Sequence, residues 1–101
     1  QGVKVELPKV AANSLPPDEQ EPVILTISKT GEYYLNVGDN LKKPVSAETV
    51  QQRVSLILKQ KPQIPVLVRG DKDVDYGSVT TAMVLLQAAG VDKVGLMTDQ
   101  P

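Results

Sequence analysis

The stretch "PVLVRGDKDVDYGSVTTAMVLLQAAGVDKVGLMT", residues 65–98, decides the fold of this chain. It opens with a short, apolar, β-branched run at 65–69, which is typical of a buried strand. It closes with "KVGLMT", residues 93–98, which predicts a second strand. Between them, residues 76–89 repeat apolar side chains at helical spacing, on the face formed by Val79, Ala82, Met83 and Leu86. Gly90 suits the position just after a helix end. The stretch therefore predicts a βαβ unit with parallel strands and a right-handed crossover.

A predicted hairpin and a predicted helix precede this unit. Residues 23–28 and 33–37 are rich in β-forming residues, and Gly31 in the short connection between them can adopt a positive φ. Ser46 is a predicted helix N-cap and Pro62 stops that helix. Its core-facing positions are Val50, Val54, Ile57 and Leu58. The element order is then ββαβαβ, so we expect an α+β fold with a mixed β-sheet and two helices packed on one face.

The first 22 residues differ from the rest. Residues 3–8 alternate apolar and charged side chains, as a strand does, and Pro8 ends the pattern. A Pro-rich, polar stretch follows, which is typical of a flexible linker. We expect domain boundaries at 1–22 for the linker and 23–101 for the globular domain. A lone strand is not stable in water, so Val3, Val5, Leu7 and Pro8 either dock on a sheet edge or belong to a spacer that never docks.

Composition excludes several classes of function. The chain of 101 residues is one domain at most and contains neither cysteine nor histidine. Disulfides, typical zinc sites and histidine-based acid/base catalysis are therefore excluded, although the lack of cysteine does not fix the compartment. Lys and Arg total 11 and Asp and Glu total 12, which gives no clustered basic face for nucleic acid. We expect no cofactor.

The run "DKDVDYGSV", residues 71–79, holds three aspartates at alternate positions. Calcium-binding loops of the EF-hand type need a glycine at position 6 and a glutamate at position 12, where this chain has Tyr76 and Ala82. Catalytic carboxylates need a substrate cleft that nothing else in the sequence supplies. A structural role fits better. Asp75 can cap the following helix by accepting from a backbone N–H of residue 77 or 78, and Asp71 can hold the turn after the strand.

A hydrophobic staple completes this structural interpretation, because Val74 and Val79 occupy the two positions whose side chains meet across a helix start. We therefore expect neither a catalytic residue nor a metal ligand in this run. Glycine-rich phosphate-binding motifs are also missing, since Gly70 and Gly77 form neither a P-loop nor a dinucleotide fingerprint. The alternative function class is a small-ligand or enzyme domain of the same topology. The lack of catalytic, metal-binding and phosphate-binding motifs disfavours it.

Several motifs in order along the chain resemble the ExbD/TolR family. They are a strand at 66–69, the turn "DKDVDY", a helix ending in Ala89-Gly90 and the strand start "KVGL". "YLNVGD" resembles the hairpin of the family and "VKVELP" resembles its segment just after the membrane anchor. The strand "GLMT" is more similar to TolR, whereas "LNVGD" and "VKVELP" are closer to ExbD, which is the branch we favour.

The resemblance implies a periplasmic recognition domain of a motor subunit driven by the proton-motive force. The full-length protein would be anchored in the inner membrane by a helix absent from this chain, beside an ExbB-like channel subunit. Partners would be a TonB-like protein, during nutrient uptake across the outer membrane, and a second copy in a homodimer. The alternative is a TolR-like, peptidoglycan-binding subunit of the Tol-Pal envelope system. Candidate dimer or peptide contacts are Tyr33, Tyr34, Val94, Leu96 and Met97.

Overall fold

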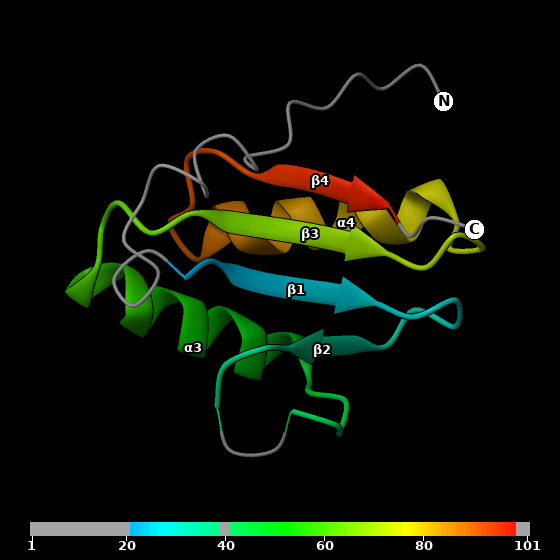
Figure 1. Cartoon of the computed structure of the whole chain (residues 1–101), viewed down its shortest axis with the longest axis horizontal. Coiled ribbons are helices and arrows are strands. Elements are labelled where there is room, and N and C mark those ends of the chain that lie inside the picture. Colours follow the sequence, from blue (N-terminus) through cyan, green and yellow to red (C-terminus); the bar gives the residue numbers. More distant parts are fainter. Residues whose placement is uncertain (1–20, 39–40, 99–101) are drawn as a thin grey trace.

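The computed structural model describes residues 21–38 and 41–98. It contains the six predicted elements in the predicted order (Figure 1). They are β1 (Val23–Ile27), β2 (Tyr33–Leu35), α3 (Ala47–Gln60), β3 (Val66–Gly70), α4 (Tyr76–Ala88) and β4 (Gly95–Thr98). The predicted strand-like segment 3–8 lies outside the described residues, as does most of the linker 1–22, so the domain boundary stays a prediction.

The four strands form one mixed sheet in the order β2-β1-β3-β4. β1 pairs antiparallel with β2 and parallel with β3, and β3 pairs parallel with β4. Leu25 on β1 is opposite both Leu35 and Val68, so the same alternation runs across three strands. The predicted α+β fold with a mixed sheet is confirmed.

One face of the sheet carries the core. Alternate residues of β1, which are Val23, Leu25 and Ile27, are fully buried, while the residues between them are only half-buried. Val50 and Val54 of α3 and Ala82 and Leu86 of α4 belong to the same buried cluster. Because a single set of alternate strand residues meets both helices, both helices cover one face, as predicted. Figure 1 shows α4 behind β3 and β4.

Local sequence signals place most of the helix and turn boundaries. Ser46 caps α3, since its side chain accepts a hydrogen bond from the backbone N–H of Thr49 at 3.1 Å. Helix α3 stops two residues before Pro62, which cannot continue a helix. Gly31 in the hairpin and Gly90 after α4 have φ of +89° and +108°, where a side chain would be strained. These predictions are confirmed.

The strands β2 and β4 are shorter than the sequence predicted. β2 ends at Leu35 rather than at residue 37, because Asn36 continues the pairing with its side chain. Its Oδ1 accepts from the backbone N–H of Ile24 at 2.8 Å, and its Nδ2 donates to the carbonyl of Pro22 at 2.9 Å. β4 begins at Gly95 rather than at residue 93.

Candidate functional site

The turn that follows β3 is held by Asp71. Its carboxylate accepts a hydrogen bond from the backbone N–H of Asp73 at 2.8 Å, and its carbonyl accepts from the N–H of Val74 at 2.9 Å. This side-chain turn is the role predicted from the sequence. The carboxylate of Asp71 is therefore committed to the backbone of its own loop.

Asp75 occupies the N-cap of α4, but it caps differently from the prediction. Its carboxylate makes no hydrogen bond to a backbone N–H of the first turn. It accepts instead from the hydroxyl of Ser78 at 2.7 Å. The expectation of a backbone cap was wrong, because the carboxylate bonds to the Ser78 side chain, one turn along the helix, instead.

This environment lowers the pKa of Asp75. The largest cause is the hydrogen bond from the Ser78 hydroxyl, which favours the ionised carboxylate, and slight desolvation of this exposed group opposes it. The nearby backbone N–H groups of Ser78 and Gly77 add smaller contributions in the same direction as the hydroxyl. Asp75 is thus an ionised group at the positive end of α4, where negative charge is favourable.

Val74 and Val79 converge over Gly70, as a hydrophobic staple requires. A Cβ built on Gly70 would lie 2.9 Å from Val74 Cγ1 and 3.7 Å from Val79 Cγ2. Within residues 21–38 and 41–98, no three acidic side chains come close enough to hold a metal ion. The run 71–79 therefore fixes the end of β3 against the start of α4, and the carboxylates of Asp71 and Asp75 both bond within it.

The five candidate interface residues divide between the two faces of the sheet. Tyr33, Val94 and Leu96 are partly buried and pack against the core on the helix side. Tyr34 is opposite Thr26, and Met97 is opposite the exposed Arg69, so both lie on the face without helices. The expectation that one of two adjacent tyrosines faces outward is confirmed.

Tyr34 makes a polar contact on this open face. Its hydroxyl donates to Glu32 Oε1 at 3.4 Å. The pKa of Tyr34 is raised, first by partial burial and then by the negative charge of Glu32. The phenol therefore stays protonated and remains a hydrogen-bond donor at neutral pH.

β4 is an edge strand of the sheet that the described residues form. Within the part of the chain that the structure describes, β3 is its sole strand neighbour, so the backbone on its outer side has no partner strand. The opposite edge is shielded in part, because Tyr33 of β2 bridges to Val45. An unpaired edge presents N–H and C=O groups that an extended peptide can add to.

A cleft of about 660 Å³ opens at the start of this edge. It is lined by 62–67 before and within β3, by 90–95 before and within β4, and by Leu58 of α3. Its walls are mainly apolar, with one exposed acid and one exposed base, Asp92 and Lys93. Gly95 adds no side chain opposite Leu67. A peptide strand added to β4 would thus begin beside this cleft.

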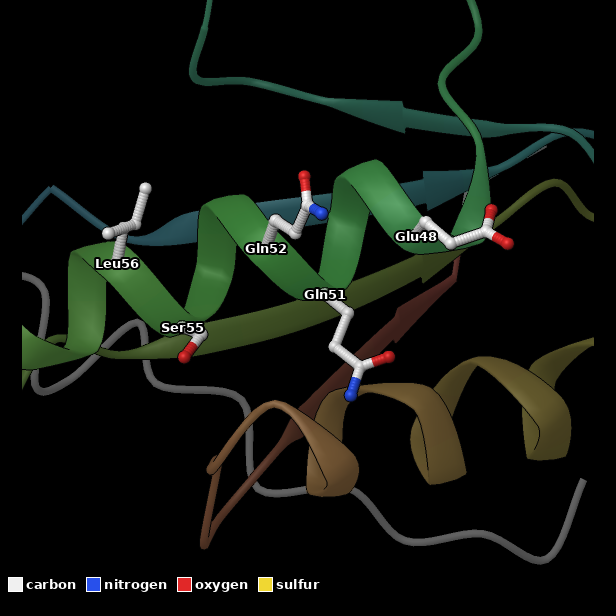
Figure 2. A pocket seen from close by; sticks show the side chains of 5 residues that line it. All are labelled: Glu48, Gln51, Gln52, Ser55 and Leu56. Carbon is white, nitrogen blue, oxygen red and sulfur yellow. The ribbon is translucent and has the colours of Figure 1, made fainter.

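A second recess, of about 540 Å³, lies along α3. Figure 2 shows the five side chains that line it, which are Glu48, Gln51, Gln52, Ser55 and Leu56. Gln51 points towards α4, where its Nε2 donates to the carbonyl of Ala88 at 3.4 Å. The recess was not predicted from the sequence, because none of the predicted core positions of this helix lines it. Exposed Leu56, outside the core pattern, was the available signal.

A family model described as "Biopolymer transport protein ExbD/TolR" matches residues 1–100. The chain belongs to the ExbD/TolR family. It is 44% identical over 108 residues to the Tol-Pal system protein TolR of Pseudomonas aeruginosa, a match that covers the whole chain and 74% of that protein. It is 35% identical to Escherichia coli TolR, over 97% of the chain and 70% of that protein.

An ExbD relative is less similar. The biopolymer transport protein ExbD of Neisseria gonorrhoeae is 31% identical over 96% of the chain and 67% of that protein. The preference for ExbD over TolR drawn from the sequence is therefore not supported, because "LNVGD" and "VKVELP" are short motifs that whole-chain identity outweighs. Proteins of this family are anchored in the inner membrane and carry a periplasmic domain. None of the described helices is long and apolar enough to cross a membrane.

Proposed function

We propose that this chain is the periplasmic domain of a TolR-type subunit of a Tol-Pal envelope system. The observation that carries the proposal is the 44% identity to a TolR over the full chain, against 31% to an ExbD. The domain recognises partners in the periplasm and performs no ion translocation itself. Its channel partner is then TolQ-like and its energised partner TolA-like, in place of the ExbB-like and TonB-like proteins of the ExbD interpretation.

A domain exchange tests the proposal. The matched region of Pseudomonas aeruginosa TolR is replaced by this chain, and the hybrid is expressed in cells that lack TolR. We expect it to restore detergent resistance and retention of periplasmic enzymes. The control hybrid carries Leu86→Asp, which places a charge in the core and should abolish rescue.

The parallel exchange into the ExbD of Neisseria gonorrhoeae should fail to restore TonB-dependent iron uptake. Rescue of iron uptake without rescue of the envelope would overturn the TolR assignment and return the ExbD interpretation. Since both hybrids use the same insert, a difference between them reports the branch of the family.

The β4 edge is the proposed recognition surface. An extended segment adds to Gly95–Thr98 through backbone hydrogen bonds, and one of its side chains enters the cleft at 62–67 and 90–95. Residues 3–8 have the pattern of such a strand, so they occupy the edge in a closed state and a partner segment replaces them in an open state. Met97 lies on this strand, and Tyr34 lies on the same open face with two strands, β1 and β3, between them.

Removing residues 3–8 tests whether they compete with a partner segment for the β4 edge. Deletion of 1–21 should increase the affinity for an extended TolA-derived peptide, because the edge no longer has to be vacated first. The matched control keeps the length and replaces Val3, Val5 and Leu7 with aspartate, which should have the same effect. Equal affinities for the deleted, substituted and original chains would contradict the closed state.

Peptidoglycan is a further ligand under the TolR-type assignment, because TolR-like members of the family bind it. Co-sedimentation with isolated cell-wall sacculi measures this binding directly. Retention of the chain in the pellet is expected, and a chain that stays in the supernatant would remove peptidoglycan from the proposal. The Leu86→Asp variant controls for trapping of unfolded protein.

A further inference from the structure

The chain enters the folded domain beside the cleft of about 660 Å³. The backbone N–H of Val23 donates to the carbonyl of Pro65, a residue that lines the cleft, at 2.9 Å. The carbonyl of Pro22 accepts from Asn36 Nδ2 at 2.9 Å. Because β1, β3 and β4 are parallel, their N-terminal ends lie together at one end of the sheet (Figure 1). The residues before Pro22 therefore start at the wall of the cleft.

The cleft is larger than one side chain requires. A volume of about 660 Å³ lies in the range of pockets that hold a drug-sized ligand, so several side chains fit in it. Leu58, Ile64 and Val94 line the cleft and are only half-buried. They leave apolar surface that an occupant can remove from water.

The rim of the cleft is basic. Lys93 lines the cleft, and Lys61 directly precedes the lining residue Pro62. Both lysines are exposed, as is Asp92, the single acid among the lining residues. The rim thus carries two ammonium groups for one carboxylate. Such a site favours an occupant with an apolar part and adjacent acidic side chains.

We propose that the occupant is the chain's own segment 15–19, Leu-Pro-Pro-Asp-Glu, which precedes the described residues. The segment joins an apolar tripeptide to two acids, which is the combination that the walls and the rim favour. Strand β4 lies two strand spacings from β1, about 10 Å. The chain from Leu15 to Glu21 extends to at most about 24 Å, so the segment reaches across the cleft to its β4 side.

The two prolines lower the entropy cost of docking. Proline fixes its own φ and biases the residue before it towards an extended conformation. Leu15, Pro16 and Pro17 therefore lose less conformational freedom than an ordinary tripeptide when they enter the cleft. Proline-rich segments bind apolar grooves of other proteins for the same reason. Leu15 brings the largest apolar side chain, and Asp18 and Glu19 then meet the lysines of the rim.

Docking of 15–19 makes the segment a competitor at the β4 edge. The cleft opens at the start of this edge, so a partner side chain that enters the cleft must displace the segment. This consequence rests on the proposed recognition edge. The docking itself does not rest on it, because it uses only the cleft, its rim and the point where the chain enters the domain.

A spin label beside the segment tests the proposal in the intact chain. The chain contains no cysteine, so a Ser14→Cys variant carries a single nitroxide label. Paramagnetic broadening of ¹⁵N-labelled amides should be strongest at the cleft, on Ile64, Lys93 and Val94. It should be weak on Asp73, at the opposite end of the sheet. Equal broadening at Asp73 and at the cleft would overturn the proposal.

A mixed sample separates docking within one molecule from docking between molecules. Spin-labelled chain without ¹⁵N is mixed with unlabelled ¹⁵N chain, and no broadening at the cleft is expected. Broadening as strong as in the singly labelled sample would place the segment on a second molecule and overturn the proposal.

A substitution within the segment tests which side chain enters the cleft. Leu15→Asp should reduce the broadening at the cleft several-fold, because a carboxylate is costly to bury against apolar walls. The matched control is Val10→Asp, the same kind of change at an aliphatic linker residue outside 15–19, and it should leave the broadening unchanged. Undiminished broadening in Leu15→Asp would overturn the proposal.

A charge exchange tests the contact between the segment and the rim. A variant with Lys61→Glu and Lys93→Glu should reduce the docked population by about two- to five-fold. Adding Asp18→Lys and Glu19→Lys should restore it. Both lysines are exposed, so the domain should stay folded, which thermal unfolding checks. A quadruple variant that docks no better than the lysine variant would overturn the proposal.

The outcomes are separable from those for the TolR-type function. The domain exchange can succeed while the spin label shows no docking, and docking can be observed in a chain that fails to restore the envelope.

Discussion

Replacing Gly70 with alanine tests how tightly the end of β3 is packed against the start of α4. Gly70 is buried, and the added methyl would lie 2.9 Å from Val74 Cγ1. Carbon atoms in contact prefer about 3.5–4.0 Å, so Val74 must move by more than about half an ångström. It is β-branched and packed against the core, which leaves it few alternative rotamers.

The two opposing contributions can be compared. Overpacking of this kind costs about 1–3 kcal/mol. Alanine recovers about 0.4–1 kcal/mol by restricting the unfolded chain. We therefore expect Gly70→Ala to lower the free energy of unfolding by about 1–2 kcal/mol. At about 4–8 °C per kcal/mol for a domain of this size, the melting temperature should fall by about 5–15 °C.

A double-mutant cycle assigns the cost to Val74. Urea unfolding is measured for Gly70→Ala, for Val74→Ala and for the double variant. Because Val74→Ala removes the methyl that clashes, the double variant should be more stable than the sum of the single effects predicts, by about 1 kcal/mol. The matched control is Gly77→Ala, where the new methyl meets only the exposed Asp75 carboxylate at 3.1 Å, and it should be neutral or stabilising. A stable Gly70→Ala variant, or strict additivity with Val74→Ala, would refute the packing argument.

Three further predictions concern the turn and helix ends. The folded-state pKa of Asp75 is lowered, so its contribution to stability is present above the unfolded pKa and is lost as the pH falls through the folded pKa. Asp75→Ala should therefore lower the melting temperature at pH 7, and the difference should shrink below about pH 4; a difference that does not depend on pH would contradict this. Millimolar Ca²⁺ should leave the melting temperature unchanged relative to EDTA, and a shift would reopen the metal interpretation of 71–79. Gly90→Ala should destabilise the domain by about 1–3 kcal/mol in urea, because its φ is +108°, and an unchanged midpoint would show that the backbone relaxes at little cost.

Local signals in the sequence predicted the fold well, because each depends on a few neighbouring residues. The Ser46 cap, the stop at Pro62 and the positive φ at Gly31 and Gly90 all follow from residue type alone. The alternation in β1 likewise indicated which face is buried. These features fix element order, and element order limits the sheet topologies that are possible.

Features that depend on side-chain competition or on distant residues could not be predicted. The predicted backbone cap at Asp75 was wrong, because a backbone N–H and the Ser78 hydroxyl compete for the carboxylate and the hydroxyl donates to it. β2 ends early because Asn36 bonds to Pro22 and Ile24, both more than ten residues away. The free edge at β4 and the cleft beside it required the strand order, which short motifs do not contain.

The sequence also could not assign each of the five candidate interface residues to a face of the sheet. The sequence indicated that Tyr33 and Tyr34 face opposite ways but not which one faces the core. Register decides it, because Tyr33 is opposite the buried Ile27. The uncharged outer face of α4 was visible in the sequence as a helix without Asp, Glu, Lys or Arg, and only the structure shows that this face is left uncovered by the rest of the described chain.

The central claim is that β4 is the recognition edge. Its most direct test compares the amide NMR shifts of the intact chain with those of a variant that carries both Val5→Asp and Leu7→Asp. If residues 3–8 occupy the edge, the differences outside the mutated segment should concentrate on Gly95–Thr98 and on the adjacent residues Leu67 and Arg69 of β3. Amide hydrogen exchange of Gly95–Thr98 should also become faster in the variant. Unchanged shifts and unchanged exchange at β4, in a variant that remains folded, would contradict docking at this edge.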